Sequence, residues 1–183
     1  LLKKTAAIVK GDPSQRDVFF GPVVNGRAVK TFEGAVESAK KGGKILAGGM
    51  KMTEGLFAKG HFVEPTIAQL PLDHELFRRE LFVPFLSVGV VSGLDEAIAE
   101  SNKAEYGLTA GIFTADKAEI EKFFDEIESG VCYANRRSGA TTGAWPGVQS
   151  FCGWKGSGST GKGGCGPYYI AQFMREQSRT IME

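Results

Sequence analysis

The sequence predicts an α/β fold with an open, mostly parallel sheet, and two observations carry this prediction. Between residues 84 and 135, short apolar runs alternate with amphipathic stretches in the order strand, helix, strand, helix, strand. This alternation is typical of parallel strands joined by right-handed crossovers. The run from Pro84 to Val91 is almost continuously apolar, which indicates a strand covered on both faces, as in parallel sheets.

A helix is the first regular element expected. Residues 1–26 are rich in turn-forming Gly, Asp and Pro, which predicts a loop. From 29 to 39 an apolar residue recurs every three or four positions, so one helical face is apolar. Lysines at 40–41 favour the last turn of this helix, and the glycines at 42–43 are expected to end it in a left-handed conformation.

Extended segments follow. The apolar run from Lys44 to Ala47 predicts a short strand, and the polar, glycine-containing residues 48–60 predict a surface loop or hairpin. Residues 61–67 are expected to be extended. Pro65 restricts them to an edge or a bend because it has no N–H to donate to a neighbouring strand.

The elements after residue 91 justify the alternation. The pattern over 94–98 predicts a helix, 108–113 a strand, and 130–134 another strand. Between these strands, Asp116 with Glu119 three residues later has the spacing of a helix capping box. The side chains expected on the buried side of this helix are Ile120, Phe123, Phe124 and Ile127.

Topology predicts where a ligand would bind. In open α/β sheets, ligands sit beyond the carboxyl ends of the strands. The last predicted strand ends at Asn135 and leads directly into a glycine-rich stretch. Residues 136–158 are therefore predicted to form the site.

Composition excludes several classes of function. With 22 basic and 21 acidic residues the net charge is +1, which argues against nucleic-acid or membrane-surface binding through charge. No apolar run approaches the roughly 18 residues that span a bilayer, and the first residues lack a signal-peptide layout. The three cysteines form no C-x-x-C pair, so neither a disulfide framework nor a metal site is expected, and a reducing, cytoplasmic location is favoured.

One glycine-rich stretch resembles a phosphate-binding loop. Gly156 to Gly161 matches G-x-G-x-x-G, and extension to Lys162 nearly matches a P-loop. However, Gly163 stands where a P-loop has Ser or Thr, and no strand is predicted immediately before the motif. A tight or flexible loop is the preferred interpretation. A nucleoside triphosphate site stays an alternative.

The reactive side chains show no nucleophile–base pattern. Cys132 lies in a predicted strand as a small buried hydrophobe, whereas Cys152 lies in the predicted site segment and is the most interesting thiol. Cys165 precedes a predicted helix and has no evident base beside it. His61 and His74 are expected at surface or edge positions. A structural or incidental role is the preferred interpretation for all five.

Several motifs follow one another along the whole chain, and together they resemble the C-terminal part of the catalytic domain in the aldehyde dehydrogenase superfamily. These motifs are Gly11-Asp12-Pro13 with Gly21-Pro22, Ala47-Gly48-Gly49 with Glu64-Pro65-Thr66-Ile67, Glu80-Leu81-Phe82-Val83-Pro84, Asn102 with Tyr106-Gly107-Leu108, and Phe151-Cys152-Gly153-Trp154-Lys155-Gly156-Ser157-Gly158. Further segments are similar to the 1-pyrroline-5-carboxylate dehydrogenase branch: Tyr133-Ala134-Asn135-Arg136, Thr142-Gly143-Ala144, Gly147-Val148-Gln149 and Gly166-Pro167-Tyr168-Tyr169.

The resemblance implies site residues and a cofactor, NAD, with NADP possible. Glu80 would hold the nicotinamide ribose hydroxyls, although spacing alone also allows a solvated Glu paired with a neighbouring Arg. Phe82 would pack beside the nicotinamide half. Backbone N–H groups at Gly143 and Ala144 would hold the α-carboxylate of the substrate, and Phe151 would form an aromatic wall around its aliphatic part.

The resemblance also implies a fold and an assembly. The fold would be a three-layer, open, mostly parallel sheet, with residues 1–183 forming the C-terminal portion of the catalytic domain. Residues 177–183 would be an oligomerisation strand. The expected partners are a small-molecule aldehyde and either further copies of the chain or the N-terminal part of the catalytic domain, with no nucleic acid and no membrane.

The implied reaction is the oxidation of L-glutamate γ-semialdehyde (1-pyrroline-5-carboxylate) to glutamate in proline catabolism. In the family, a cysteine thiolate attacks the aldehyde, hydride passes to NAD, and a glutamate activates the water that cleaves the thioester. These catalytic residues and the dinucleotide-binding domain lie upstream of the Gly11-Asp12-Pro13 equivalent. No catalytic residue is therefore expected in this chain, which is expected to be inactive alone.

Four residues depart from the family's pattern: Arg79, Val83, Ser150 and Cys152. Cys152 adds a side chain where the family has Gly and a positive φ is sometimes required. A non-catalytic binding or interaction module on the same fold stays an alternative.

Overall fold

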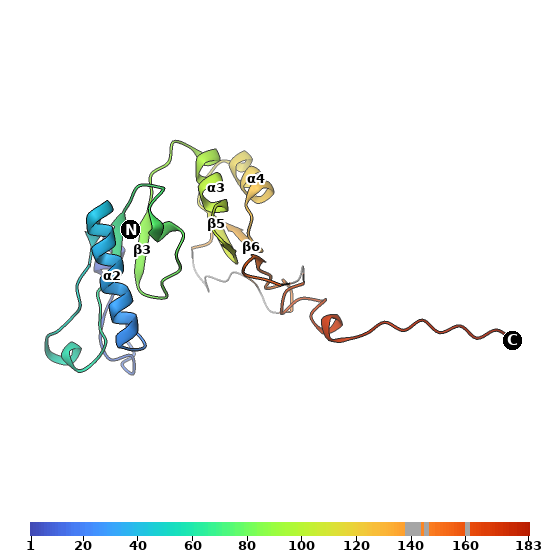
Figure 1. Ribbon diagram of the computed structural model, residues 1–183, viewed down its shortest axis with the longest axis horizontal. Helices are drawn as coiled ribbons and strands as arrows, with labels where there is room; N and C mark the ends of the chain where they lie inside the picture. Colours follow the sequence, from blue (N-terminus) through green and yellow to red (C-terminus); the bar gives the residue numbers. More distant parts are fainter. Residues whose placement is uncertain (138–143, 145–146, 160–161) are drawn as a thin grey trace. The chain divides into compact units, whose positions relative to one another are not determined.

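The computed structural model describes residues 1–137, 144, 147–159 and 162–183, which fall into two compact units, Leu1–Val90 and Val91–Glu183. Figure 1 shows the helices and strands of each unit. Each unit has its own hydrophobic core. Among the residues described, no helix has both the length and the apolar character needed to cross a bilayer.

Unit 1 is a three-stranded mixed sheet with one long helix packed against it. Its elements are α1 (Leu2–Ala6), α2 (Gly26–Gly42), β1 (Lys44–Ala47), η1 (Gly55–Lys59), β2 (Thr66–Gln69), η2 (Glu75–Phe77) and β3 (Phe85–Val88). The strand order is β1-β2-β3, with β1 antiparallel and β3 parallel to β2. The apolar face of α2, which includes Phe32 and Ala39, packs against Ile45 and Phe85 of the sheet.

The structure confirms the predicted helix and the strand at Lys44–Ala47, but the predicted left-handed glycine is wrong. Lys40 and Lys41 lie in the last turn of α2, and Gly43 follows it with a φ of −167°. This is extended backbone. Glycine is needed at Gly43 for another reason, because a Cβ there would lie 2.3 Å from the carbonyl oxygen of Gln69.

The apolar strand predicted from Pro84 to Val91 is shorter than expected, and within the described residues one of its faces is only partly covered. β3 pairs with β2 from Thr66 opposite Phe85 to Gln69 opposite Val88. Leu86 is 46% exposed and borders a shallow groove of about 260 Å³ together with Ile67 and Ile8. Within the residues described, α2 covers the opposite face.

Unit 2 contains the predicted crossover between parallel strands. Its elements are α3 (Leu94–Asn102), β4 (Tyr106–Gly107), β5 (Thr109–Ile112), α4 (Lys117–Glu126), β6 (Val131–Ala134), β7 (Trp154–Lys155) and η3 (Ile170–Phe173). β5 and β6 are parallel and are joined through α4, as predicted, while β4 and β7 form an antiparallel pair. Ile98, Phe123 and Ile127 form the core between α3, α4 and the strands.

The start of α4 shows the predicted cap in a relayed form. Asp116 accepts a hydrogen bond from the N–H of Ala118 at 2.8 Å. Glu119 accepts from the Thr114 hydroxyl, whose oxygen in turn accepts from the N–H of Asp116 at 3.1 Å. The prediction that Phe124 is buried is wrong, because its side chain is 45% exposed while the adjacent Phe123 takes the buried position. Consecutive helical residues point about 100° apart, and the elements packed against α4 cover Phe123 and leave Phe124 outward.

The end of the chain has little regular structure. Residues 167–183 are all exposed, and beyond η3 they form neither helix nor strand. The expectation that 177–183 pairs with the sheet of another subunit stays a prediction.

Candidate functional site

The two predicted cofactor-binding residues lie in one exposed bend of unit 1. After η2, the chain runs through Glu80 and Phe82 to the start of β3. Leu81 packs against one core cluster of the unit and Val83 against the other. Because these neighbours are anchored in the core, Phe82 between them projects outward and is 86% exposed.

The backbone at this bend is strained. Phe82 has a φ of +51°, in the left-handed region that non-glycine residues rarely occupy. Such a conformation costs on the order of 1–3 kcal/mol and persists where the surrounding structure enforces it, often at ligand sites. An exposed aromatic ring held by a strained backbone is an arrangement that packing of this unit alone does not require.

A hollow of about 380 Å³ joins the two residues. Its lining includes Glu80, Phe82, Arg79, Phe77 and Ser87. The carboxylate of Glu80 is exposed and offers two oxygen acceptors, which suits a pair of hydroxyl groups. The Phe82 ring offers an apolar face to a planar ring. The residues present therefore fit the ribose and nicotinamide end of a dinucleotide.

The segment predicted to form the substrate site begins at a clamp. β6 ends at Asn135, which has a φ of +54°, a conformation that Asn tolerates better than most residues. Its side chain accepts from the N–H of Thr114 at 3.0 Å and donates to the carbonyl of Thr114 at 2.8 Å. These bonds fix the carboxyl end of β6 to the chain that leaves β5.

Phe151 is held by backbone pairing. Its N–H donates to the carbonyl of Gly164 at 2.8 Å, and the N–H of Gly164 donates back at 3.1 Å. The approach is close, because a Cβ on Gly163 would lie 2.4 Å from the carbonyl oxygen of Phe151. Phe151 is half-buried, and so is Ala144, whereas Gly143 lies outside the described residues.

Glu80 and Phe82 thus belong to unit 1, and Ala144 and Phe151 to unit 2. Within unit 1 the structure brings the first pair together around one hollow. The assignment of all four to ligand binding stays a prediction.

Sequence reasoning assigned no role to three polar residues that hold the Phe151 segment in place. The ammonium of Lys155 donates to the carbonyls of Asn102 and Ala104 at 2.7 and 3.1 Å and forms an ion pair with Glu128 at 2.8 Å. The side chain of Asn102 bridges the C-terminal ends of α3 and α4 by bonding the carbonyl of Glu126 and the N–H of Glu128, each at 2.8 Å. Ser157 accepts from the N–H of Gly107 at 3.1 Å. The one sequence signal for these three residues was their position in motifs that resemble those of the family.

The histidines and cysteines form no catalytic pair or metal site. His74 caps η2 by accepting from the N–H of Leu76 at 3.2 Å. The three cysteines are free thiols, and Cys165 is exposed. Among the described residues, no group of three His, Cys, Asp or Glu side chains is arranged to hold a metal ion.

The P-loop alternative lacks its structural context. Within the described residues, the first helix after Lys162 is the short η3 at Ile170. No helix N-terminus therefore follows the lysine, although a P-loop requires one. The ammonium of Lys162 lies 4.1 Å from the centre of the Tyr168 ring, in a cation–π contact.

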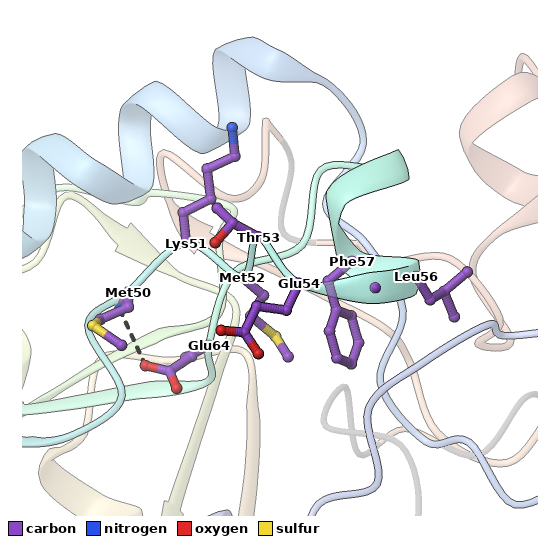
Figure 2. Close-up of a pocket in the computed structure, with 9 residues that line it drawn as sticks. Met50, Lys51, Met52, Thr53, Glu54, Leu56, Phe57 and Glu64 are labelled. Atoms are coloured by element: carbon purple, nitrogen blue, oxygen red, sulfur yellow. Dashed lines mark hydrogen bonds between the residues drawn. The ribbon is translucent and has the colours of Figure 1, made fainter.

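Unit 1 has a further hollow of about 600 Å³, shown in Figure 2. Met50, Met52 and Phe57 supply its apolar lining, and Glu64 accepts a hydrogen bond from the N–H of Met50 at 3.2 Å. None of the predicted site residues lines it. Its polar lining consists of Lys51, Thr53, Glu54 and Glu64.

Comparisons with known proteins identify one family and similar curated relatives. Residues 1–178 match the family described as Aldehyde dehydrogenase family. A relative from Halalkalibacterium halodurans named 1-pyrroline-5-carboxylate dehydrogenase 1 is 36% identical over 188 residues, which covers 100% of this chain and 35% of the relative. A Bacillus subtilis relative named 1-pyrroline-5-carboxylate dehydrogenase 2 is 35% identical, covering 100% of this chain and 34% of the relative.

Solved structures agree. A 1-pyrroline-5-carboxylate dehydrogenase from Thermus with bound NAD superimposes with a TM-score of 0.83 at 32% identity, covering 94% of this chain and 32% of that one. A 3,6-anhydro-L-galactose dehydrogenase in complex with NAP gives a TM-score of 0.83 at 33% identity, covering 93% and 35%. The chain spans about a third of the length of the curated relatives it matches. Its fold is that of the catalytic domain these structures share.

Proposed function

The chain belongs to the aldehyde dehydrogenase family, and from this premise we propose that it forms part of an NAD(P)-dependent enzyme that oxidises L-glutamate γ-semialdehyde (1-pyrroline-5-carboxylate) to glutamate in proline catabolism. The observation that carries the proposal is the similarity to proteins named 1-pyrroline-5-carboxylate dehydrogenase along the whole of this chain. The hollow that joins Glu80 and Phe82 supports it.

Glu80 and Phe82 are proposed to hold the nicotinamide end of the cofactor. When bound, the cofactor supplies the acceptor for the hydride that leaves the aldehyde carbon. The carboxylate of Glu80 would accept hydrogen bonds from ribose hydroxyls, and the exposed ring of Phe82 would limit how the nicotinamide can tilt. Their shared hollow supports both roles.

The segment after β6 is proposed to hold the substrate. Backbone N–H groups at Gly143 and Ala144 would bind its α-carboxylate, because successive amides form a concave anion site. Phe151 would pack against the aliphatic carbons. Two observations support this assignment. The side-chain bonds of Asn135 restrain the start of the segment, and those of Lys155 restrain its end.

We propose that these 183 residues act together with further protein of the family fold and as part of an oligomer. The chain spans only about a third of its curated relatives. Purified alone, it should therefore reduce no NAD with glutamate γ-semialdehyde. We also place it in the cytoplasm, in keeping with its three free thiols.

The test is Glu80→Gln in the complete enzyme that carries this chain. Loss of the charged acceptor should lower kcat/KM for NAD by roughly tenfold or more, because hydrogen bonds to charged groups contribute about 1.5–3 kcal/mol. Glu121→Gln, an exposed carboxylate on α4, is the matched control. Steady-state absorbance of the reduced cofactor measures both. Equal kinetics for the two variants would remove Glu80 from the cofactor site.

A further inference from the structure

Two thiols from segments far apart in the sequence lie on the same small stretch of backbone. The Sγ of Cys132, on β6, lies 3.3 Å from the carbonyl oxygen of Ser129, and the Sγ of Cys152 lies 3.2 Å from the carbonyl oxygen of Gly130. The two sulfurs therefore hydrogen-bond to successive peptide groups. Both cysteines are half-buried and neither is in a disulfide.

The packing at Gly130 places Cys152 next to Cys132. Gly130 lies in the bend immediately before β6, two residues from Cys132. A Cβ on Gly130 would lie 1.7 Å from the carbonyl oxygen of Cys152. The backbone of Cys152 thus occupies the place that a side chain at residue 130 would fill, two positions along the chain from Cys132.

We propose that Cys132 and Cys152 form a peroxide-sensitive dithiol that closes into an intrachain disulfide. Residues two positions apart in a chain are separated by at most about 7 Å, and a disulfide needs Cβ atoms about 4 Å apart. Closure therefore requires a shift of a few ångströms in the segment that carries Cys152. That segment belongs to no helix or strand until β7 begins at Trp154, and the neighbouring backbone bridge between Phe151 and Gly164 has to adjust with it.

The chemistry balances with hydrogen peroxide as the two-electron oxidant. One thiol releases its proton, and its thiolate attacks a peroxide oxygen. The O–O bond breaks, and the hydroxide that leaves takes up the released proton, so the products are a sulfenic acid and water. The second thiol attacks the sulfenic sulfur, the S–S bond forms, and a second water leaves. In total, two thiols and one peroxide give one disulfide and two waters.

The environment assigns the order of these steps. Burial raises the pKa of the Cys132 thiol, and the neighbouring Cys152 raises that pKa further. A raised pKa disfavours Cys132 as the attacking thiolate, so we assign the attack on peroxide to Cys152 and the resolving step to Cys132. Because Cys152 directly follows Phe151, closure would also draw the Phe151 segment toward β6.

The experiment uses the chain itself and needs no turnover, so its failure is separate from failure of the proposed function. The protein is treated with hydrogen peroxide, alkylated and digested with trypsin. Cleavage after Lys and Arg places Cys132 in peptide 123–136, Cys152 in 138–155 and Cys165 in 163–175. Mass spectrometry should find peptides 123–136 and 138–155 linked, two hydrogen masses below their sum, and released by dithiothreitol.

Serine variants make the assignment specific. Cys165→Ser should keep the linked pair, and Cys152→Ser should lose it. Cys132→Ser should leave a sulfenic acid at Cys152 that dimedone traps, and circular dichroism checks that each variant folds. Overoxidation of Cys152 in the unaltered chain without a linked pair would overturn the proposal. A link to Cys165, or one found only in cross-linked dimers on a non-reducing gel, would also overturn it.

Discussion

Backbone conformation marks the candidate site at the scale of single residues. Among the residues described, four non-glycine residues have a positive φ: Phe82, Asn135, Lys155 and Cys165. Phe82 is a predicted ligand contact, and Asn135 and Lys155 lie at the ends of the segment that carries Phe151. Strain of this kind is retained where a fixed side-chain direction matters more than stability.

Phe82 offers the simplest test of this strain. At a φ of +51°, glycine avoids a Cβ clash that costs every other residue about 1–2 kcal/mol. Because the phenyl group is 86% exposed, its removal loses little burial. Phe82→Gly should therefore unfold at a higher urea midpoint than Phe82→Ala, and its free energy of unfolding should be larger by about 1 kcal/mol. A less stable glycine variant would show that the left-handed bend does not form in solution.

At the scale of elements, one lysine ties three parts of unit 2 together. Lys155 lies on β7, yet its ammonium satisfies two carbonyls at the end of α3 and the carboxylate of Glu128 beyond α4. The last carbonyls of a helix have no partner within it, and a cation there is favourable. Lys155 is thus a shared C-terminal cap for the unit.

Replacing this cap should destabilise unit 2. Lys155→Met keeps the length of the side chain but removes the charge and both donors, so the free energy of unfolding should fall by about 2 kcal/mol. Lys103→Met is the matched control, because Lys103 pairs with Glu100 at a surface position and should cost less than about 0.5 kcal/mol. Urea denaturation followed by tryptophan fluorescence measures both. Equal losses would deny Lys155 its capping role.

The start of α3 predicts a dependence of stability on pH. The N–H of Ser92 and, to a lesser extent, its hydroxyl hydrogen-bond to the carboxylate of Glu96 and hold the pKa of that carboxyl below its ordinary value of 4.5. A lowered folded-state pKa contributes stability that is present above pH 4.5 and is lost as the pH falls through the folded-state value.

Glu96→Gln should therefore lessen the loss of stability on acidification. The measurement is the urea midpoint at about pH 6 and at about pH 3, on either side of the ordinary titration range. Ser92→Ala removes the hydroxyl donor and leaves the N–H, so it should reduce the pH dependence only in part. If Glu96→Gln loses stability as steeply as the unaltered chain, other carboxylates govern the acid transition.

Local sequence patterns predicted the elements that depend on residues close together in the sequence. The strand at Lys44–Ala47, the cap at Asp116 and the crossover through α4 follow from periodicity and capping, and the structure confirms them. The errors lie where tertiary contacts decide. Phe123 and Phe124 satisfy the helical pattern equally well, and only the neighbouring elements select which of them is buried. Gly43 is glycine because of Gln69, a partner that no local pattern reveals.

The candidate site divides in the same way. Phe82 and Phe151 were found through motifs, not through spacing or periodicity. The contacts of Lys155 were not predicted, because its partners Asn102 and Glu128 are distant in sequence. In the sequence, a lysine in a glycine-rich loop also looks the same as a solvated lysine. Side-chain bonds to the carbonyls of another element leave no periodic trace in the sequence.

For the whole molecule, the fold is that of a family in which this chain accounts for part of the length. Each unit buries its own core, but large apolar side chains remain exposed in both, such as Leu86 at 46% and Phe113 at 66%. These exposed side chains are compatible with our proposal that the chain acts together with further protein. This agrees with the coverage of about a third of its relatives.

The end of the chain gives this argument a direct test. In residues 177–183, Ile181 and Met182 are 91% and 90% exposed, and the side chain of Arg179 hydrogen-bonds to Gln177, two positions away. All of these residues are exposed, so their deletion should change the free energy of unfolding, measured in urea, by less than about 0.5 kcal/mol. If the segment pairs with the sheet of another subunit, the deletion should nevertheless lower the mass of the assembled enzyme, as measured by light scattering.

Ile181→Asp with Met182→Asp should act in the same direction, because charges oppose burial at an interface. An unchanged mass in both variants would assign assembly to other surfaces, whereas a large loss of stability would place the tail in the fold of its own subunit.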